Sequence, residues 1–345
     1  MHIGLPKEIK DGEFRVGLTP EGAAALVRAG HAVRFETGAG AESGFADGDY
    51  LRAGARPGDP WSAELIVKVK ELQPGERRMP RPEQTVFCFQ HFAPDVPLLE
   101  AALASGATFV AFETVGEADG SLPILKPMSK IAGRLAVQVG AWCLQKHQGG
   151  SGVLLPGVDG VPPGKVVIVG AGAVGSNALA VAHGMGARVG VYAKSEKHFA
   201  ALRARYPNVG FSTRTPEVAD ADLVIGAVLV PGSLSPKLLT RAMLRGMRRG
   251  SALVDVGIDQ GGIAETSHPT KHSAPVFVEE GVVHYCVPNM PAACARTASL
   301  ALEQALLPWL LELAAGGEPS PALASGFQVR AGKVVHAQLA RDTGR

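Results

Sequence analysis

Four ionisable side chains stand where the predicted strands of this sequence end. Lys70 closes the apolar run LIVKVK, His91 closes VFCFQH, Asp259 follows LVDVGI, and Arg15 lies in the loop after the first predicted strand. Ligands of doubly wound sheets bind beyond the carboxyl ends of the strands, so we expect these groups to share a pocket. A guanidinium can bind a carboxylate, and an imidazole can transfer a proton.

Each of these side chains also has an ordinary structural interpretation. Arg15 could be a surface loop residue, and Lys70 shares one strand face with Lys68, as lysines that protect a sheet edge do. His91 could be a hydrogen-bonded core histidine, and Asp259 could cap the glycine turn that follows it. The residues themselves leave these alternatives open.

A glycine-rich stretch over residues 165–186 predicts a dinucleotide-binding turn. Val166–Val169 reads as a strand buried on both faces, and GAGAVG and a helix of small residues follow it. Gly170 would make the tight turn, Gly172 would let the backbone approach a pyrophosphate, and Gly175 would let the helix pack close to the strand. The helix N-terminus would then receive the phosphates. The alternative is a strand–helix turn that binds nothing.

Length and composition favour a two-domain protein without strong charge. The chain has 345 residues, 46% of them hydrophobic, and a net charge of +2, which gives no indication of a nucleic-acid partner. Four cysteines without metal-type spacing suit a reducing cytoplasm. The N-terminal segment lacks the apolar core of a signal peptide, and we find no run of about 18 apolar residues, so no membrane span or membrane partner is expected.

The predicted elements alternate between strand and helix in both halves, which indicates mostly parallel sheets. Expected strands cover residues 2–5, 31–36, 65–70, 86–90, 108–112, 166–169, 188–192, 222–228, 252–256 and 282–286. Expected helices cover residues 19–27, 95–105, 130–148, 173–184, 196–206 and 297–314. We expect a substrate domain of residues 1–128 plus about 300–345, with a dinucleotide-binding domain of residues 129–299 inserted in it.

Long motifs in this chain resemble the alanine dehydrogenase family, which also includes the cofactor-binding subunit of the proton-translocating transhydrogenase. They are GLPKEIKDGEFRVGLTPEG, VKVKE, VFCFQH, AFETV, PMSKIAGRLAVQVGA, VVIVGAGAVG, ADLVIGAVLVPG, LVDVGIDQGG and CVPNMPAACARTAS. The resemblance implies an α/β fold of two Rossmann-like, doubly wound domains with a cleft between them, usually assembled as a hexamer. It implies an NAD(P)-dependent amino acid dehydrogenase that interconverts a 2-amino acid and a 2-oxo acid plus ammonia by hydride transfer.

The resemblance also implies roles for the ionisable residues. Arg15 would pair with the substrate carboxylate, and Lys70 would hydrogen-bond the 2-oxo oxygen and stabilise charge that develops there. His91 would be the general acid/base, and Asp259 would act with it on the water or amine of the carbinolamine steps. The pocket would be lined by Met128 and Asn289.

The resemblance places the cofactor contacts in the glycine turn and beyond the strand ends. The expected residues are Ser129, Gly170, Gly172, Ala173, Val174, Gly175, Ala193, Lys194, Ser195, His198, Val228, Leu229, Val256, Ile258, Asp259, Val287, Asn289 and Met290. No metal ligands are expected.

The chain departs from the family at the end of the second Rossmann strand. NAD-dependent members carry an aspartate at the position of Ala193, where a carboxylate holds the ribose 2′-hydroxyl. Here Lys194 and Ser195 offer a positive charge and a hydroxyl that suit a 2′-phosphate. We therefore predict a preference for NADP(H) over NAD(H). The alternative is a permissive loop that accepts both cofactors.

Other departures concern basic positions and the substrate. His198 and His268 stand where the family commonly has Lys or Arg, which would make cofactor binding looser or pH-dependent. The segment 54–61 is several residues shorter than in typical members. Gln90 replaces an apolar residue beside the expected acid/base, which suits a more polar substrate than alanine unless the side chain bonds only the backbone.

A nucleotide-responsive regulatory protein is not excluded by the sequence but has no positive support in it, and two further rival functions remain open. One is an NADP-dependent reductase of another imine or 2-oxo acid in a specialised pathway, and the other is a non-catalytic nucleotide-binding module. The joint presence of Arg15, Lys70, His91 and Asp259 argues against a purely binding role. We expect a small-molecule substrate, a cytoplasmic location and a homo-oligomer, either a dimer or a hexamer.

Overall fold

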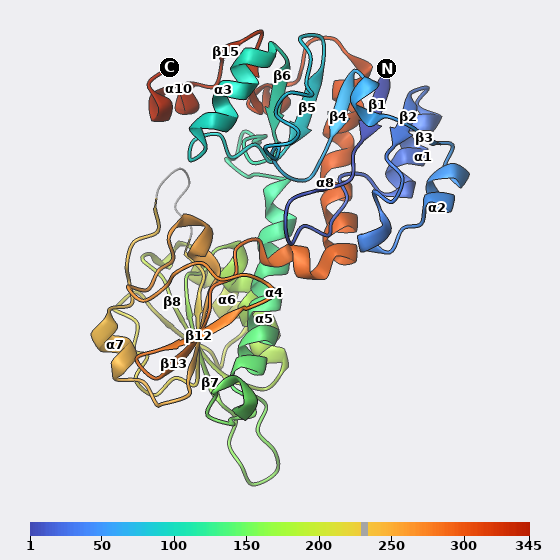
Figure 1. Cartoon of the computed structure of the whole chain (residues 1–345). Coiled ribbons are helices and arrows are strands. Elements are labelled where there is room, and N and C mark those ends of the chain that lie inside the picture. The colour runs from blue at the N-terminus through green and yellow to red at the C-terminus, as the bar shows by residue number, and fades with distance from the viewer. Residues whose placement is uncertain (229–233) are drawn as a thin grey trace. The chain divides into compact units, whose positions relative to one another are not determined.

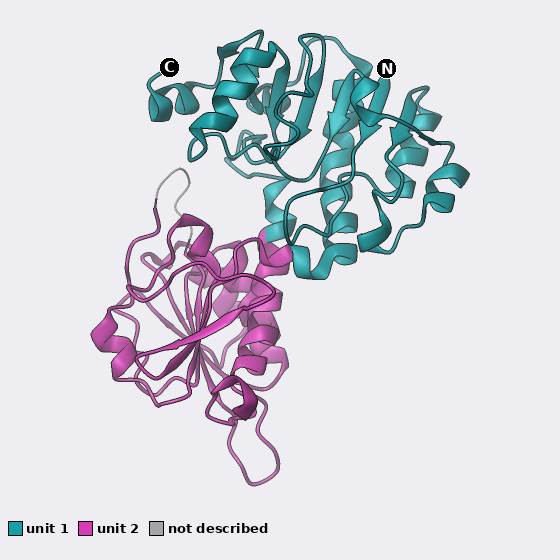
Figure 2. Cartoon of the chain, in the orientation of Figure 1, with its two compact units in different colours: residues 1–128, 292–345 teal, residues 129–291 magenta. Residues whose placement is uncertain are grey.

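The computed structural model describes residues 1–228 and 234–345 and divides into two compact units. Unit 1 contains residues 1–128 and 292–345, and unit 2 contains residues 129–291 (Figure 2). The chain enters unit 2 within the helix α4 (Leu125–Cys143) and has returned to unit 1 before the helix α8 (Ala295–Ala315) begins.

Unit 1 is built on an eight-stranded sheet (Figure 1). Its strands are β1 (His2–Leu5), β2 (Ala32–Phe35), β3 (Arg56–Pro57), β4 (Leu65–Val67), β5 (Thr85–Cys88), β6 (Thr108–Ala111), β14 (Phe327–Arg330) and β15 (Lys333–Val334). They lie in the order β15-β14-β6-β5-β4-β1-β2-β3. β14 pairs antiparallel with β6 and with β15, whereas the other neighbours are parallel. The C-terminal hairpin therefore extends the sheet of unit 1.

Unit 1 contains helices with and without a capping side chain at their first turn. They are α1 (Pro20–Arg28), α2 (Asp47–Arg52), α3 (Val96–Ser105), α8, α9 (Pro321–Ala324) and α10 (Ala337–Thr343), with the 3-10 turns η1 (Ala41–Ser43) and η2 (Pro60–Ser62). The Thr19 side chain accepts a hydrogen bond from the backbone N–H of Glu21 at the start of α1. Asp95 accepts one from Leu98 at the start of α3, and Gly106, with a φ of 68°, ends that helix.

The helix α8 is anchored in unit 1 by polar groups. Glu303 accepts hydrogen bonds from Thr19 through its backbone N–H (2.5 Å) and its hydroxyl (2.8 Å), and Ser299 Oγ accepts one from the backbone N–H of Val16 (3.0 Å). Burial raises the pKa of Glu303. Within the described residues, Met290–Ala315 is one stretch whose length and apolar composition would allow it to cross a membrane. Its buried residues pack against α1 and η1 of unit 1.

Unit 2 is built on a seven-stranded sheet. Its strands are β7 (Lys165–Val169), β8 (Arg188–Tyr192), β9 (Gly210–Ser212), β10 (Leu223–Gly226), β11 (Ala252–Asp255), β12 (Val276–Glu279) and β13 (Val282–Tyr285). They lie in the order β12-β13-β11-β10-β7-β8-β9, and the pairing of β12 with β13 is antiparallel. Apart from β12, this is the 3-2-1-4-5-6 order of dinucleotide-binding sheets. The strands β1 to β6 repeat it in unit 1, which confirms the predicted doubly wound α/β fold.

The remaining helical elements are α5 (Ala173–Gly184), α6 (Phe199–Arg205), α7 (Arg241–Arg245), η3 (Lys146–Gln148), η4 (Glu196–His198), η5 (Val256–Gln260) and η6 (Met290–Cys294).

The bounds of α4, β4 and β5 are among those that differ from the expected ones. The long helix α4 begins before the expected residue 130 because Pro127 is tolerated in a first helical turn, and it ends at Cys143. β4 and β5 end before residues 70 and 90, so the chain has left the sheet where Lys70 and His91 stand.

Candidate active site

The chain that leaves β4 is held by a buried ammonium group. Lys68 is fully buried, and its Nζ lies 2.7 Å from Glu76 Oε1 and 3.4 Å from Glu8 Oε2. Glu8 Oε1 also accepts a hydrogen bond from the backbone N–H of Val69 at 2.6 Å. Burial would lower the pKa of Lys68, but Glu8 and Glu76 raise it overall, so the ammonium remains charged. Lys70 therefore follows a segment that is fixed immediately before it.

Lys70 and His91 are brought together beyond the carboxyl ends of β4 and β5. Lys70 Nζ lies 3.4 Å from His91 Nε2 and 5.8 Å from the ring centroid of Phe89. Lys70 is only 8% exposed, whereas His91 is exposed to solvent. Burial would raise the pKa of the neighbouring Glu71, but Lys70, Lys10 and His91 lower it overall. The carboxylate of Glu71 thus remains ionised, 4.0 Å from Lys70 Nζ.

The backbone of His91 is held in a turn by Glu113. His91 has a φ of 48°, in the left-handed region that residues other than glycine seldom adopt. Glu113, which follows β6, accepts hydrogen bonds from the backbone N–H of His91 (2.9 Å) and of Gln90 (3.0 and 3.2 Å). These bonds stabilise the turn in which His91 stands.

The side chain of Gln90 bonds the backbone of the sheet. Its Nε2 donates to the carbonyl oxygens of Val86 (3.2 Å) and Val110 (3.3 Å), in β5 and β6. The sequence left open whether Gln90 faces a polar substrate or bonds only the backbone, and the structure shows bonds to the backbone. Gln90 therefore gives no support to a substrate more polar than alanine.

Arg15 is a buried residue of the loop between β1 and α1. Its side chain donates to Glu13 through Nε (2.7 Å) and Nη2 (2.5 Å), and Nη1 lies 3.2 Å from Met128 Sδ. The same loop packs on the segment after β4, because a Cβ at Gly17 would lie 3.1 Å from the backbone of Lys68. A two-point bond with a carboxylate fixes the plane of the guanidinium. At 3% exposure, Arg15 is no surface residue.

Two of the other structural alternatives are also excluded. Lys70 is no sheet-edge lysine, because it follows β4, which lies between β1 and β5. In the turn before the glycines, the hydrogen bonds go to Asp255, which accepts from the backbone N–H of Gly257 (3.1 Å) and of Ile263 (2.7 Å). Burial raises the pKa of Asp255. Asp259 itself is exposed in η5.

The glycine turn of unit 2 has the geometry that a pyrophosphate needs. Gly170 has a φ of 119°, and a Cβ there would lie 2.3 Å from the carbonyl oxygen of Ala227. A Cβ at Gly175 would lie 1.8 Å from the carbonyl oxygen of Gly170, so α5 packs directly on the turn. Gly172 faces open space, and no described side chain caps α5, which begins with Ala173 and Val174. The first N–H groups of α5 are therefore open to an anion.

The other expected cofactor residues follow the ends of the strands of unit 2. They are Ala193, Lys194 and Ser195 after β8, Val228 after β10, Val256, Ile258 and Asp259 after β11, and Val287, Asn289 and Met290 after β13. Asn289 has a φ of 57°. Ser129 is half-buried in α4, and Leu229 lies outside the described residues.

His198 and His268 lie at opposite sides of the unit 2 sheet. His198 is exposed in η4, after β8. His268 stacks on Phe277 of β12, with ring centroids 3.8 Å apart, and β12 is the opposite edge strand of the sheet from β9, the neighbour of β8. The two histidines therefore cannot bind the same group of a ligand.

Several carboxylates that organise unit 1 escaped the sequence prediction. Glu8 and Glu13 lie within GLPKEIKDGEFRVGLTPEG, and Glu113 lies within AFETV, two of the motifs that carry the resemblance. Those motifs could have drawn attention to these carboxylates, but spacing along the chain does not predict which carboxylate pairs with which cation. Unit 1 pairs Arg15 with Glu13 and Met128, and Lys70 with His91.

Comparison with known proteins gives the family. Residues 4–132 match the family described as Alanine dehydrogenase/PNT, N-terminal domain, and residues 136–337 match Alanine dehydrogenase/PNT, C-terminal domain. The chain belongs to the alanine dehydrogenase/PNT family. The implied family membership is thus confirmed.

Individual relatives in this family agree over the whole length. The alanine dehydrogenase of Halomonas elongata is 48% identical over 360 residues, which covers 100% of this chain and 97% of that protein. The alanine dehydrogenase of Mycobacterium tuberculosis is 44% identical over 361 residues, with the same coverage. A solved L-alanine dehydrogenase has a TM-score of 0.96 at 46% identity and covers 100% of this chain, and 99% of that chain is matched. A transhydrogenase from Sinorhizobium meliloti has a TM-score of 0.84 at 25% identity, with 97% of this chain and 100% of that chain covered.

These full-length matches show the class of reaction. The chain is an amino acid dehydrogenase, an oxidoreductase that acts on a CH–NH₂ donor and depends on a nicotinamide dinucleotide. Its substrates are small molecules. The imine-reductase and binding-module alternatives are not favoured.

Removal of the Glu113 carboxylate tests its role as a positioning residue for His91. Glu113→Ala leaves the backbone N–H groups of Gln90 and His91 without this acceptor, so we expect kcat/KM to fall about 100-fold, the effect of a small displacement of a reacting group. Glu113→Gln keeps one acceptor oxygen and should recover part of the activity, with the pH profile of kcat/KM displaced because the nearby negative charge is lost. Glu117→Ala, at an exposed position, is the control. Equal activity of the wild type and the alanine variant would exclude the role.

Proposed function

We propose that the chain interconverts L-alanine and pyruvate plus ammonia, with the reacting carbon held beside Lys70 and His91. The observation that carries this proposal is the 3.4 Å approach of Lys70 Nζ to His91 Nε2 beyond two parallel strands. The names of the full-length relatives supply the choice of alanine.

The roles of the unit 1 residues follow from their chemistry. The nicotinamide dinucleotide, when bound, accepts hydride from C2 of the amino acid or returns it. Arg15 would bind the substrate carboxylate, with its guanidinium plane set by Glu13. Lys70 would donate a hydrogen bond to the 2-oxo oxygen and stabilise the negative charge that develops on it. His91 Nε2 would take or give the proton as the carbinolamine forms and collapses.

Unit 2 supplies the remaining groups of the proposal. Asp259 would orient the water or the amine together with His91, and Asn289 would lie near the nicotinamide. The fit of unit 2 to a dinucleotide is supported by the open N-terminus of α5 and by the backbone contacts that require Gly170 and Gly175.

A panel of 2-oxo acids with ammonium tests the reaction. Pyruvate should give the highest kcat/KM, measured as loss of absorbance of the reduced cofactor. His91→Asn should lower kcat/KM by roughly 100- to 10,000-fold because the proton-transfer group is lost. His2→Asn changes an exposed histidine of β1 and should behave like the wild type. Wild-type turnover in the His91 variant would contradict the assignment, and a better substrate than pyruvate would correct the choice of alanine.

We further propose that NADP(H) is preferred over NAD(H). Ala193 is half-buried after β8 and offers no carboxylate to a ribose 2′-hydroxyl. Lys194 is exposed and has no partner among the described residues. Ser195 Oγ accepts a hydrogen bond from the backbone N–H of Lys197 at 3.1 Å and keeps its own proton available for a phosphate oxygen. A phosphate group is favoured by the added cation and is not repelled by a carboxylate.

A substitution at the end of β8 tests this preference. The wild type should show kcat/KM for NADPH at least about tenfold above that for NADH, which corresponds to roughly 1.4 kcal/mol. Ala193→Asp should reverse the ratio because the new carboxylate binds the 2′-hydroxyl and repels the 2′-phosphate. Lys194→Ala should lower the NADPH value, whereas Lys197→Ala, two residues beyond the exposed Ser195, is the matched control. A wild type that prefers NADH would refute the proposal.

We also propose that the chain forms a homo-oligomer, a dimer or a hexamer, in the cytoplasm. Leu154, Val158 and Val161 are each more than half exposed on the segment between α4 and β7. Val158 and Val161 form an isolated antiparallel bridge, and the segment extends away from the sheet of unit 2 (Figure 1). Three exposed apolar side chains on one projecting turn suit burial against another copy. The four cysteines are free, which suits a reducing compartment such as the cytoplasm. Cell fractionation checks this location.

Sedimentation velocity tests the assembly. The wild type should sediment as a dimer or hexamer at micromolar concentration, and Val158→Asp with Val161→Asp should shift it to smaller species because charges would be buried in the interface. Val335→Asp, at another half-exposed apolar position, is the control. A monomeric wild type would contradict the proposal.

A further inference from the structure

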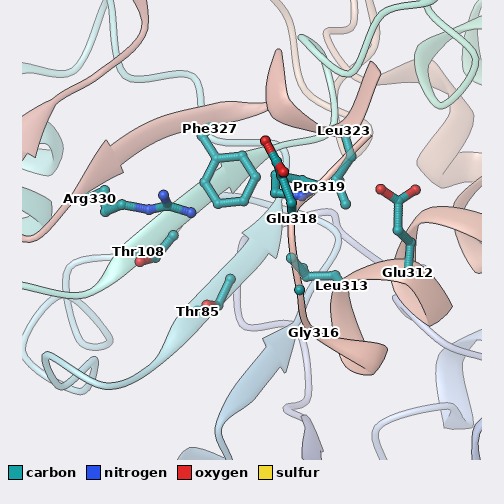
Figure 3. A pocket seen from close by; sticks show the side chains of 11 residues that line it. Thr85, Thr108, Glu312, Leu313, Gly316, Glu318, Pro319, Leu323, Phe327 and Arg330 are labelled. Atoms are coloured by element: carbon teal, nitrogen blue, oxygen red, sulfur yellow. The ribbon is translucent and has the colours of Figure 1, made fainter. Parts of the chain in front are cut away.

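A small cavity lies at the edge of the unit 1 sheet opposite the candidate active site (Figure 3). It adjoins Thr85 and Thr108, the first residues of β5 and β6, whereas His91 follows the carboxyl end of β5. Its volume is about 120 Å³. Pockets for drug-sized ligands begin at about 300 Å³, so this cavity suits a molecule less than half as large as such a ligand.

The cationic side of the cavity is formed by Arg330 at the end of β14. Its Cζ lies 4.5 Å from the ring centroid of Phe327, and no described residue forms an ion pair or hydrogen bond with its guanidinium. In Figure 3 the guanidinium lies on one side of the Phe327 ring, near Thr108. A stacked guanidinium with open donors is a ready partner for a carboxylate.

Two hydroxyl groups stand next to this cation. Thr85 and Thr108 are directly paired in the parallel register of β5 and β6, so their side chains share one face of the sheet. Both line the cavity, and within the described part of the chain neither hydroxyl has a hydrogen-bond partner. Each can donate to the oxygen of an anionic ligand.

The anionic side of the cavity follows the end of α8. Glu312 accepts hydrogen bonds from Ser320 through its backbone N–H (2.6 Å) and its hydroxyl (3.2 Å), which fix the carboxylate. Glu318 is exposed and forms no ion pair within the described residues. Figure 3 shows both carboxylates on the side of Phe327 away from Arg330. Leu313, Leu323 and Pro319 add apolar lining between the charges.

We propose that this cavity binds a small zwitterionic α-amino acid at a site separate from the catalytic one. Its carboxylate would lie against Arg330 and the two threonine hydroxyls, and its ammonium would face Glu318 and Glu312. A short apolar side chain fits on Phe327. The two carboxylates disfavour a dicarboxylate ligand, and the volume excludes a dinucleotide.

Calorimetric titration without cofactor tests this site in the full chain. The probes are L-alanine, glycine, L-aspartate, acetate and ethylammonium. We expect L-alanine or glycine to show a binding component that weakens at least tenfold in Arg330→Ala and persists in Lys333→Ala, which removes a neighbouring exposed cation of the same hairpin. Acetate and ethylammonium each lack one charge and should bind at least tenfold more weakly than L-alanine.

The catalytic rate separates this site from the active site. At saturating substrate and cofactor, Arg330→Ala should keep the wild-type kcat while it loses the binding component. Thr108→Val and Glu318→Gln should each weaken the calorimetric binding of L-alanine or glycine. If the melting temperature shows that Arg330→Ala is unfolded, these two variants test the site in its place. Identical binding in the wild type and these variants would overturn the proposal. Acetate that binds as tightly as L-alanine, or a component lost together with kcat, would also overturn it.

Discussion

A parallel sheet brings the carboxyl ends of its strands to one edge, and both units depend on that constraint. In unit 1 the edge collects Lys70 after β4 and His91 after β5, from places 21 residues apart in the chain. In unit 2 it collects the glycine turn after β7 and the segments after β10, β11 and β13. Because both sheets have the 3-2-1-4-5-6 order, the strand order reverses between two central strands, where ligands of such folds bind.

Three buried carboxylates and the half-buried carboxylate of Glu113 then hold the segments that leave the strands of unit 1. Glu8 and Glu76 hold Lys68, Glu13 holds Arg15, and Glu113 holds the backbone of His91. Buried ion pairs add little net stability, but the loss of one partner costs about 3–5 kcal/mol because a charge is left unpaired. The buried ion pairs of Lys68 and Arg15 therefore maintain the geometry of the segments that carry them.

The two units divide the chemical requirements between them. Unit 2 offers the backbone N–H groups at the start of α5, beside a turn in which a Cβ at Gly170 or Gly175 would clash, so a phosphate there would be bound by the main chain. Unit 1 offers charged side chains, so its selectivity is set by which groups are buried and paired. The free charges around Arg330 and Glu318 stand apart from both arrangements, at the opposite edge of the unit 1 sheet.

The sequence by itself determined the features that depend on neighbouring residues. The cap at Thr19, the turn at Gly170 and the mostly parallel sheets all follow from local pattern, because capping, φ preference and hydrophobic periodicity act within a few residues. Tertiary structure decided what depends on distant partners. Gln90 bonds the backbone of β5 and β6, and Glu113 binds the backbone of His91 across 22 residues. Such pairs are set by packing between elements, which spacing along the chain does not encode.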